Sequence, residues 1–299
     1  MIPVKIDISK KPELEPEFAL SALQTAWQGS DEAAVKTPDM GGANPDELAS
    51  LGRAVAVDAG VSPPPAAQKI RRASFLDLRA VPQISEQDAA RVFPMMNPGF
   101  PGEWKEQIRQ LRTRLNGLQA ESAMQEQELQ IVAITNLRAR SPRHGMAANL
   151  ALTMSSMRDM RVLVVDAKLS TADMRMLLGE STGAGLCEAS RASREDLPAS
   201  FRRITGTQIY LMPGGDASAH PLDPLDLRGV HAVLQSLRPQ FDWILLDCPS
   251  FDSPSDAMAM SMFADGTLML VEREQDGFEA MERALGQVQG KRLLGAVIV

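Results

Sequence analysis

Residues 129–135 read LQIVAIT, an apolar and β-branched run that is followed by further runs of the same kind. These runs are RVLVVD (161–166), TQIYLM (207–212), WILLDC (243–248), GTLMLVE (266–272) and LLGAVIV (293–299). They show little alternation of polar and apolar residues, as expected of strands that are buried on both faces of a sheet. We therefore predict six strands at the centre of the fold.

Stretches with helical character separate these runs. They cover residues 145–158, 171–178, 225–237, 255–263 and 277–288. Strand–helix alternation over about 170 residues predicts a mostly parallel sheet with helices on both faces. The predicted fold class is therefore α/β, in which ligands bind at the carboxyl ends of the strands.

A long helix is predicted before the first strand. Residues 103–128 read EWKEQIRQLRTRLNGLQAESAMQEQE, and Ile108, Leu111, Leu115 and Leu118 recur at spacings of three and four. This spacing places the four side chains on one face of a helix.

The first third of the chain differs in composition. Residues 1–102 hold twelve of the twenty prolines. Short helical patterns occur at residues 16–27 (PEFALSALQTAW) and 85–93 (SEQDAARVF), but no long period is sustained. We predict a largely extended or disordered arm that carries short docking segments. A small independent domain is the alternative.

The charge balance and the sequence of the N-terminus exclude several classes of protein. The 299 residues carry a net charge of -7, because 38 Asp and Glu outnumber 31 Lys and Arg, which argues against a nucleic-acid-binding protein. The chain begins without a signal-peptide pattern and contains no apolar run of transmembrane length. We predict a cytoplasmic protein, with no direct membrane insertion, whose link to a membrane comes through a partner.

The cysteines and histidines give no sign of a disulfide framework or a metal site. Cys187 and Cys248 are the two cysteines, and we expect both to be buried as small apolar residues. His144, His220 and His231 are too scattered to form a zinc site.

The chain contains, in this order, IVAIT followed by AANLA, then RVLVVDAKL, FDWILLDCPSFDSPSDA and ADGTLMLVERE. This series resembles the P-loop domain of bacterial tyrosine kinases (BY-kinases), over residues 103–299. BY-kinases work in capsule and exopolysaccharide export and belong to the wider MinD/ParA-like class. The resemblance implies a P-loop NTPase-like fold with a nucleotide site between the first strand and the helix that follows it.

The phosphate-binding (Walker A) loop departs from the family pattern. The family's glycine–acid–glycine–lysine–serine–threonine run falls on Arg140, Ser141, Pro142, Arg143, His144 and Gly145. Arg143 thus replaces the lysine and His144 replaces the hydroxyl that binds magnesium. Pro142 removes an N–H that would face phosphate, and a planar guanidinium needs more room than an ammonium. We expect no cofactor, or at most weak binding of ATP with magnesium.

The acidic motifs of the family are partly retained. Asp166 keeps the first acid of an Asp-x-Asp motif, Lys168 stands in place of the second, and Asp247 keeps the acid after a later strand. We predict an ion pair between Lys168 and either Asp166 or Asp247 that closes the site without nucleotide. The two acids are interpreted as relics of a nucleotide site, with capping of local structure as the alternative.

The assembly motif of the family survives in EQIRQLR. Glu106, Arg109 and Arg112 match the E-x-x-R-x-x-R pattern by which BY-kinases pack into rings. Spacings of three place the side chains along one helical ridge, from which carboxylate–guanidinium pairs can reach a neighbour. A solvated helix face with internal ion pairs is the alternative.

The tyrosine acceptors of a BY-kinase are missing. BY-kinases phosphorylate a C-terminal tyrosine cluster, whereas this sequence stops at Val299 within the last predicted strand. Its single tyrosine, Tyr210, lies in the run TQIYLM, where we expect a position in the core or on a sheet face.

These features favour a non-catalytic BY-kinase-like protein that acts as a scaffold or regulator in exopolysaccharide biosynthesis or export. It is expected to form a homo-oligomer and to bind a membrane adaptor of the chain-length-determinant type or an authentic tyrosine kinase. One alternative is an active ATP-dependent tyrosine autokinase with an atypical loop, so enzymatic activity stays open. Another is a MinD/ParA-like spatial regulator.

Overall fold

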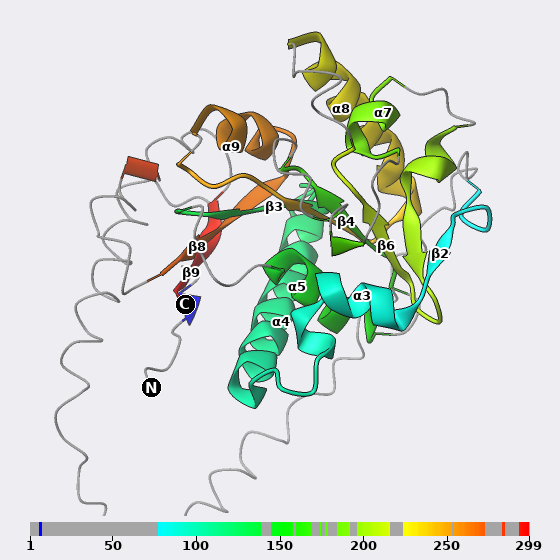
Figure 1. The fold of residues 1–299 in the computed structure, drawn as a ribbon. Coiled ribbons are helices and arrows are strands. Elements are labelled where there is room, and N and C mark those ends of the chain that lie inside the picture. The colour runs from blue at the N-terminus through cyan, green and yellow to red at the C-terminus, as the bar shows by residue number, and fades with distance from the viewer. Residues whose placement is uncertain are drawn as a thin grey trace, which may run out of the picture.

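The structure of the chain is a computed structural model (Figure 1). It describes residues 6–7, 77–138, 145–157, 160–168, 174, 177–178, 184–191, 196–215, 224–252, 254–272, 283–284 and 293–298. Among these residues, one mixed sheet is covered by helices on both faces, which confirms the predicted α/β class.

The described strands form one sheet in the order β1-β9-β8-β3-β7-β4-β6-β5-β2. Its central strands are β3 (Ile131–Asn136), β4 (Val162–Asp166), β6 (Ile209–Met212), β7 (Trp243–Asp247), β8 (Gly266–Val271) and β9 (Leu293–Ile298). All pairings among these six strands are parallel. They are the six strands predicted from the apolar runs, with only small shifts at their ends.

Short strands complete the two edges of the sheet. At one edge β1 (Ile6–Asp7) pairs antiparallel with β9. At the other edge β5 (Arg202–Ile204) pairs antiparallel with β6, and β2 (Gln83–Ile84) pairs parallel with β5. These strands were not predicted, because two or three residues are too few to show a period.

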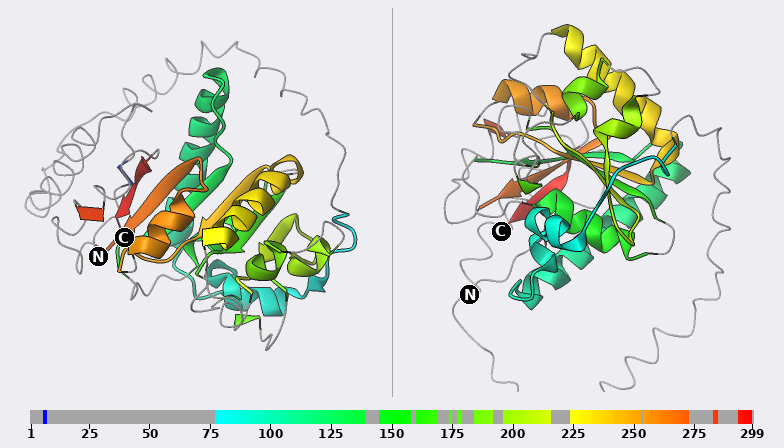
Figure 2. Two further views of the ribbon diagram at one scale, coloured as in Figure 1. Left: turned by 90° about the horizontal axis from the view of Figure 1, so that it is seen from above. Right: turned by 45° about the vertical axis from the view of Figure 1, so that its right-hand side comes forward.

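Helices α3 (Glu86–Val92), α4 (Gly102–Met124) and α5 (Met146–Ser155) cover one face of the sheet, and α7 (Leu186–Ala189) and α8 (Pro224–Leu237) cover the other (Figure 2). Helix α9 (Pro254–Ser261) also lies on this second face. Most of the predicted helices at residues 277–288 and 171–178 lies outside the described residues. No helix in the described part of the chain is both long enough and apolar enough to span a bilayer.

Helix α4 has the apolar face that its sequence predicts. Ile108, Leu111, Leu115 and Leu118 are all buried, and they pack with residues of α5 and of the sheet. The helix ends at Met124, earlier than predicted, because Glu126 adopts a left-handed backbone with φ of 57°.

The arm predicted for residues 1–102 is wrong in its last part, because residues 77–102 pack onto the domain. The pattern SEQDAARVF does form a helix, α3, whose N-cap Ser85 accepts a hydrogen bond from the backbone N–H of Asp88 at 3.1 Å. Val92 and Phe93 are buried in the same cluster as α4 and α5. Apart from β1, the remainder of the predicted arm, including residues 16–27, lies outside the described residues.

Candidate functional site

The carboxyl ends of the neighbouring central strands β3, β7 and β4 lie side by side. Strand β7 lies between the other two, and Asp166 of β4 is the register partner of Asp247 of β7. The two acids that the sequence marks as relics of a nucleotide site are therefore neighbours. Their position agrees with the general location of ligand sites in α/β sheets.

Lys168 joins this pair of acids. Its Nζ lies 2.9 Å from Oδ1 and 2.9 Å from Oδ2 of Asp247. The predicted ion pair is present, with Asp247 as the partner of Lys168. The two side chains are only 14% and 23% exposed, so their attraction is less screened by water than that of a surface pair.

Asp166 has a different set of contacts. Its Oδ1 accepts the backbone N–H of Lys168 at 3.1 Å, and its Oδ2 accepts that of Met174 at 3.0 Å. Burial raises the pKa of this carboxyl to about 7, and the nearby charge of Asp247 adds to the shift. Asp166 thus holds the backbone N–H groups of Lys168 and Met174 and is partly protonated near neutral pH.

Cys248 follows Asp247 and is fully buried. Burial raises the pKa of its thiol, and the charge of Asp247 raises it further. The thiol therefore stays protonated and is a poor nucleophile. Cys187 is buried as well, which confirms the prediction for both cysteines.

The start of α5 borders the predicted phosphate loop. Gly145 adopts a φ of 91°, and a Cβ at this position would lie 2.9 Å from Cδ of Pro94. One residue further, the backbone N–H of Met95 donates to Oδ1 of Asn149 in α5 at 2.9 Å. The segment that follows α3 therefore packs on the first turn of α5. Arg143 and His144 lie outside the described residues, as do residues 140–142.

The described carboxylates at this site, Asp166 and Asp247, do not fit a magnesium ion with their present contacts. Magnesium binds carboxylate oxygens and water in octahedral geometry. Here both oxygens of Asp247 accept from the Lys168 ammonium, and both oxygens of Asp166 accept backbone N–H groups. A divalent ion that bound at these strand ends would first have to displace the Lys168 ammonium from Asp247. The described residues also contain no cluster of three or more His, Cys, Asp or Glu side chains suited to a metal.

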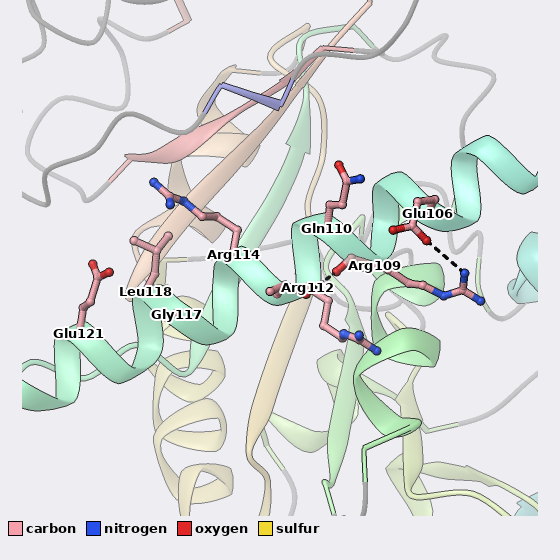
Figure 3. A pocket seen from close by; sticks show the side chains of 9 residues that line it. Glu106, Arg109, Gln110, Arg112, Arg114, Gly117, Leu118 and Glu121 are labelled. Atoms are coloured by element: carbon pink, nitrogen blue, oxygen red, sulfur yellow. Dashed lines mark hydrogen bonds and ion pairs between the residues drawn. The ribbon is translucent and has the colours of Figure 1, made fainter. Parts of the chain in front are cut away.

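The three residues of the assembly motif lie on α4 but differ in their contacts (Figure 3). Arg109 pairs with Glu106 of its own helix at 3.3 Å, and both side chains are more than half exposed. Arg112 Nη1 donates to the backbone oxygen of Thr153 at 2.9 Å, near the end of α5. The internal pair is the contact that a solvated helix face would make, and the assembly role stays a prediction.

A second ion pair at the opposite end of the strands was not predicted. Both Nη atoms of Arg238 donate to the Asp265 carboxylate, with Nη1 to Oδ2 at 2.9 Å. Oδ2 of Asp265 also accepts the backbone N–H groups of Gln130 and Ile131, each at 2.8 Å. No motif marked this cluster, because Arg238 and Asp265 are distant in the sequence from the start of β3.

Tyr210 occupies the core position that its sequence predicts. It is 2% exposed, and its ring meets that of Phe241 edge-on at 5.3 Å between centroids. The Arg203 guanidinium lies 5.6 Å from the centre of the Tyr210 ring.

Residues 129–290, more than half of the chain, match the family model described as "Cellulose biosynthesis protein BcsQ". The chain belongs to the BcsQ family. Among curated relatives, the succinoglycan biosynthesis transport protein ExoP of Rhizobium meliloti is 24% identical over 148 residues, which are 48% of this chain and 19% of ExoP. The tyrosine-protein kinase wzc of Salmonella typhimurium is 23% identical over 182 residues, 61% of this chain and 24% of wzc. This BcsQ-family chain spans about a quarter or less of the length of these relatives.

Solved structures of tyrosine kinase domains share the fold. The BceF tyrosine kinase domain superposes with a TM-score of 0.55 at 18% identity, covering 85% of this chain and 97% of that domain. The kinase domain of the Escherichia coli tyrosine kinase ETK gives a TM-score of 0.54 at 20% identity, covering 65% of this chain and 74% of the other. The predicted resemblance to the P-loop domain of BY-kinases is confirmed.

Proposed function

We propose that this chain is a non-catalytic, BY-kinase-like member of the BcsQ family that acts as a scaffold or regulator in exopolysaccharide biosynthesis or export. The observation that carries the proposal is the Lys168–Asp247 ion pair at the carboxyl ends of β4 and β7. In the kinases that the sequence resembles, an acid stands at the position of Lys168. Here the position holds a fixed positive charge.

The chemistry of phosphoryl transfer explains why this matters. Transfer from ATP needs magnesium to bridge the phosphates and to neutralise the charge that develops on them. An ammonium that is bound to Asp247 occupies an acid that would hold the ion, and burial keeps Asp166 partly protonated. Arg143 and His144 are a second argument against phosphoryl transfer, because in the sequence they replace the lysine and the hydroxyl of the phosphate loop.

The setting in polysaccharide biosynthesis is supported by two comparisons. The family is named for cellulose biosynthesis, and ExoP is a succinoglycan biosynthesis transport protein. On this proposal the chain binds a membrane adaptor of the chain-length-determinant type, or an authentic tyrosine kinase, and also associates with itself. The motif residues Glu106, Arg109 and Arg112 on α4 are the first candidates for these contacts.

The nucleotide part of the proposal is tested by calorimetry of the full chain with ATP and magnesium. The expected result is no measurable heat and no rise in melting temperature, with an active BY-kinase domain as the positive control. Micromolar binding with phosphorylation of tyrosine would support the autokinase instead. Micromolar binding with hydrolysis but no phosphotyrosine would favour a MinD/ParA-like regulator.

A gain-of-binding variant sharpens this test. Lys168→Asp alone restores the family acid, and we expect it to stay without ATP binding because the loop at residues 140–144 is unchanged. Combining Lys168→Asp with Pro142→Gly, Arg143→Lys and His144→Ser restores both halves of the site. Binding by the combined variant, but not by either half alone, is the expected pattern.

The motif is tested separately by light scattering. Arg109→Ala removes an exposed side chain that pairs with Glu106 of its own helix, so folding should be unaffected. If the motif mediates assembly, the Arg109→Ala variant should form a particle of lower mass than the wild type, or should fail to bind the partner protein. Equal masses and equal partner binding would assign Arg109 to a solvated helix face.

A further inference from the structure

Polar side chains of α4 reach the segment where α5 ends, and α5 lies beside α4 (Figure 1). Arg112 Nη1 donates to the backbone oxygen of Thr153 at 2.9 Å. One turn further along α4, Asn116 Nδ2 donates to the sulfur of Met157 at 3.4 Å. The backbone N–H of Met157 donates to the oxygen of Met154 at 3.1 Å. Met157 is therefore held by α5 through its main chain and by α4 through its sulfur.

Asn116 is poorly satisfied by this contact. A thioether sulfur is a weak acceptor of hydrogen bonds. The oxygen of the amide, Oδ1, is buried and has no hydrogen-bond partner among the residues that the structure describes. A buried polar group without a partner costs stability, so an apolar side chain of similar size would suit the helix contact better. Packing of the reduced protein therefore does not explain an amide at this position.

Met157 is accessible to a small oxidant from solvent. It is 42% exposed, whereas Met154, one turn earlier, is fully buried. Hydrogen peroxide oxidises an accessible thioether to a sulfoxide, which is polar where the thioether is apolar. In this step a sulfur lone pair attacks one peroxide oxygen, the O–O bond breaks and an S–O bond forms. The proton on the transferred oxygen passes to the departing hydroxide, which leaves as water, so sulfur loses the two electrons that the peroxide gains.

We propose that Met157 is a site of reversible oxidation by peroxide, and that Asn116 binds the oxidised form. The sulfoxide adds a strong acceptor at the position where Asn116 Nδ2 now meets sulfur. The amide then gains a full hydrogen bond, and the end of α5 is held more tightly to α4. A thiol-dependent sulfoxide reductase reverses the change, because two thiols form a disulfide and the sulfoxide oxygen leaves as water.

This site goes beyond the proposed function, because it depends neither on the Lys168–Asp247 ion pair nor on a partner protein. It also reverses the usual effect of the modification. Oxidation of a methionine normally disrupts the packing around it, whereas here we expect oxidation to stabilise the folded chain. The sign of the change in stability therefore distinguishes a methionine with a matched donor from one that is merely exposed.

Glutamine imitates the oxidised side chain, because its amide oxygen is an uncharged acceptor on a side chain of similar length. We expect Met157→Gln to melt about 2–4 °C above Met157→Leu, which is the shift that one additional hydrogen bond gives in a chain of this size. In the Asn116→Leu background the same comparison should show no gain. Met258 on α9 is 41% exposed and provides the matched control, since Met258→Gln should not melt above Met258→Leu.

Oxidation of the full chain with hydrogen peroxide tests the modification itself. Peptide mass spectrometry should find a sulfoxide at Met157 but none at Met154, and treatment with a sulfoxide reductase should remove it. Other methionines are oxidised as well, so the contribution of Met157 is the melting temperature of the wild type minus that of Met157→Leu, both oxidised. We expect oxidation to raise this difference when Asn116 is present and to lower it in the Asn116→Leu background.

A Met157 that stays reduced while Met258 is oxidised would overturn the proposal. So would an effect of oxidation that is the same with and without Asn116, or a glutamine variant that melts no higher than the leucine variant. If Asn116→Leu does not fold, Asn116→Ala takes its place in both comparisons. The proposed function is judged by ATP binding and by light scattering of Arg109→Ala, and these measurements do not depend on the state of Met157.

Discussion

The two ends of the central strands each hold an ion pair that is largely withdrawn from water, and the two pairs differ in how completely they are satisfied. At the amino end, the Arg238 fork meets the Asp265 carboxylate, which also accepts two backbone N–H groups. At the carboxyl end, one ammonium serves Asp247 while a second acid, Asp166, lies on the adjacent strand.

This difference separates a structural contact between Arg238 and Asp265, called the clamp below, from a site that we propose to be a relic of nucleotide binding. In the clamp, Asp265 is the only carboxylate in the described part of the chain that is largely withdrawn from water beside Arg238, because the second acidic partner, Glu128, is 74% exposed, and Asp265 ties β3 to the start of β8. Two acids with one lysine leave an excess of negative charge, which folding alone does not favour. The excess lies where α/β folds bind ligands, and we interpret it as inherited from a site that once held a cation.

Breaking the clamp should have the largest effect. Asp265→Ala leaves the largely buried Arg238 guanidinium with only the exposed Glu128 as an acidic partner and removes the acceptor of two backbone N–H groups, so unfolding free energy should fall by about 3–5 kcal/mol. Urea unfolding measures the change. Glu128→Ala, which removes a 74% exposed partner of the same arginine, is the control and should have a change near zero. A loss below about 1 kcal/mol for Asp265→Ala would show that the clamp is not the stronger pair.

Removing the Lys168 ammonium at the carboxyl ends of the strands should lower the free energy of unfolding by less than Asp265→Ala does. Lys168→Met keeps the length of the side chain but leaves Asp247 and Asp166 facing each other, and we expect a loss of about 1–2 kcal/mol. The loss is limited because Asp166 can take up a proton, and it should grow as the pH is raised from 6 to 8. A loss as large as that of Asp265→Ala would remove the distinction between the two ends.

Asp166 should make the free energy of unfolding depend on pH. Its pKa is about 7 in the folded chain against 3.8 for the ordinary group, so the folded state holds a proton that the unfolded state releases. The stabilisation is full below pH 4, falls as the pH rises, and is gone above pH 7, with a slope of at most about 1.4 kcal/mol per pH unit. Asp166→Asn should flatten the curve of unfolding free energy between pH 5 and 7. Parallel curves for the variant and the wild type would contradict the raised pKa.

The exposed pair on α4 should give the smallest effect. Glu106→Ala removes the partner of Arg109, and both side chains are well solvated, so unfolding free energy should change by about 0.5 kcal/mol or less. Addition of salt should abolish the difference from the wild type. A change above about 1 kcal/mol would mean that this pair has a structural role comparable with Lys168.

Much of the fold follows from the sequence because buried parallel strands are continuous apolar runs. LQIVAIT, WILLDC and GTLMLVE each became a central strand. The core face of α4 was predicted residue by residue, since a regular helix converts spacing directly into position. The ion pair of Lys168 was predicted too, because the family resemblance places Lys168 and two retained acids, Asp166 and Asp247, around one site.

Which of the two acids, Asp166 or Asp247, pairs with Lys168 could not be predicted from the sequence. That choice depends on the register between β4 and β7 and on the backbone N–H groups of Lys168 and Met174, which donate to the two Asp166 oxygens. Residues 77–102 were misjudged because their prolines obscured a few buried side chains, such as Val92 and Phe93. The clamp was not predicted from the sequence, because its residues come close together only when α8, β3 and β8 are packed in the folded chain.

The pairing of β1 with β9 has a consequence for how the sheet folds. Ile6 is in register with Val297, and β9 lies between β8 and β1. These paired residues are separated by nearly the whole of this sequence. Strand β3 likewise pairs with β7 and β8, which come more than a hundred residues later. Pairings of such long sequence separation are slow to form, because the entropy of closing the intervening loop is lost before the contacts are gained.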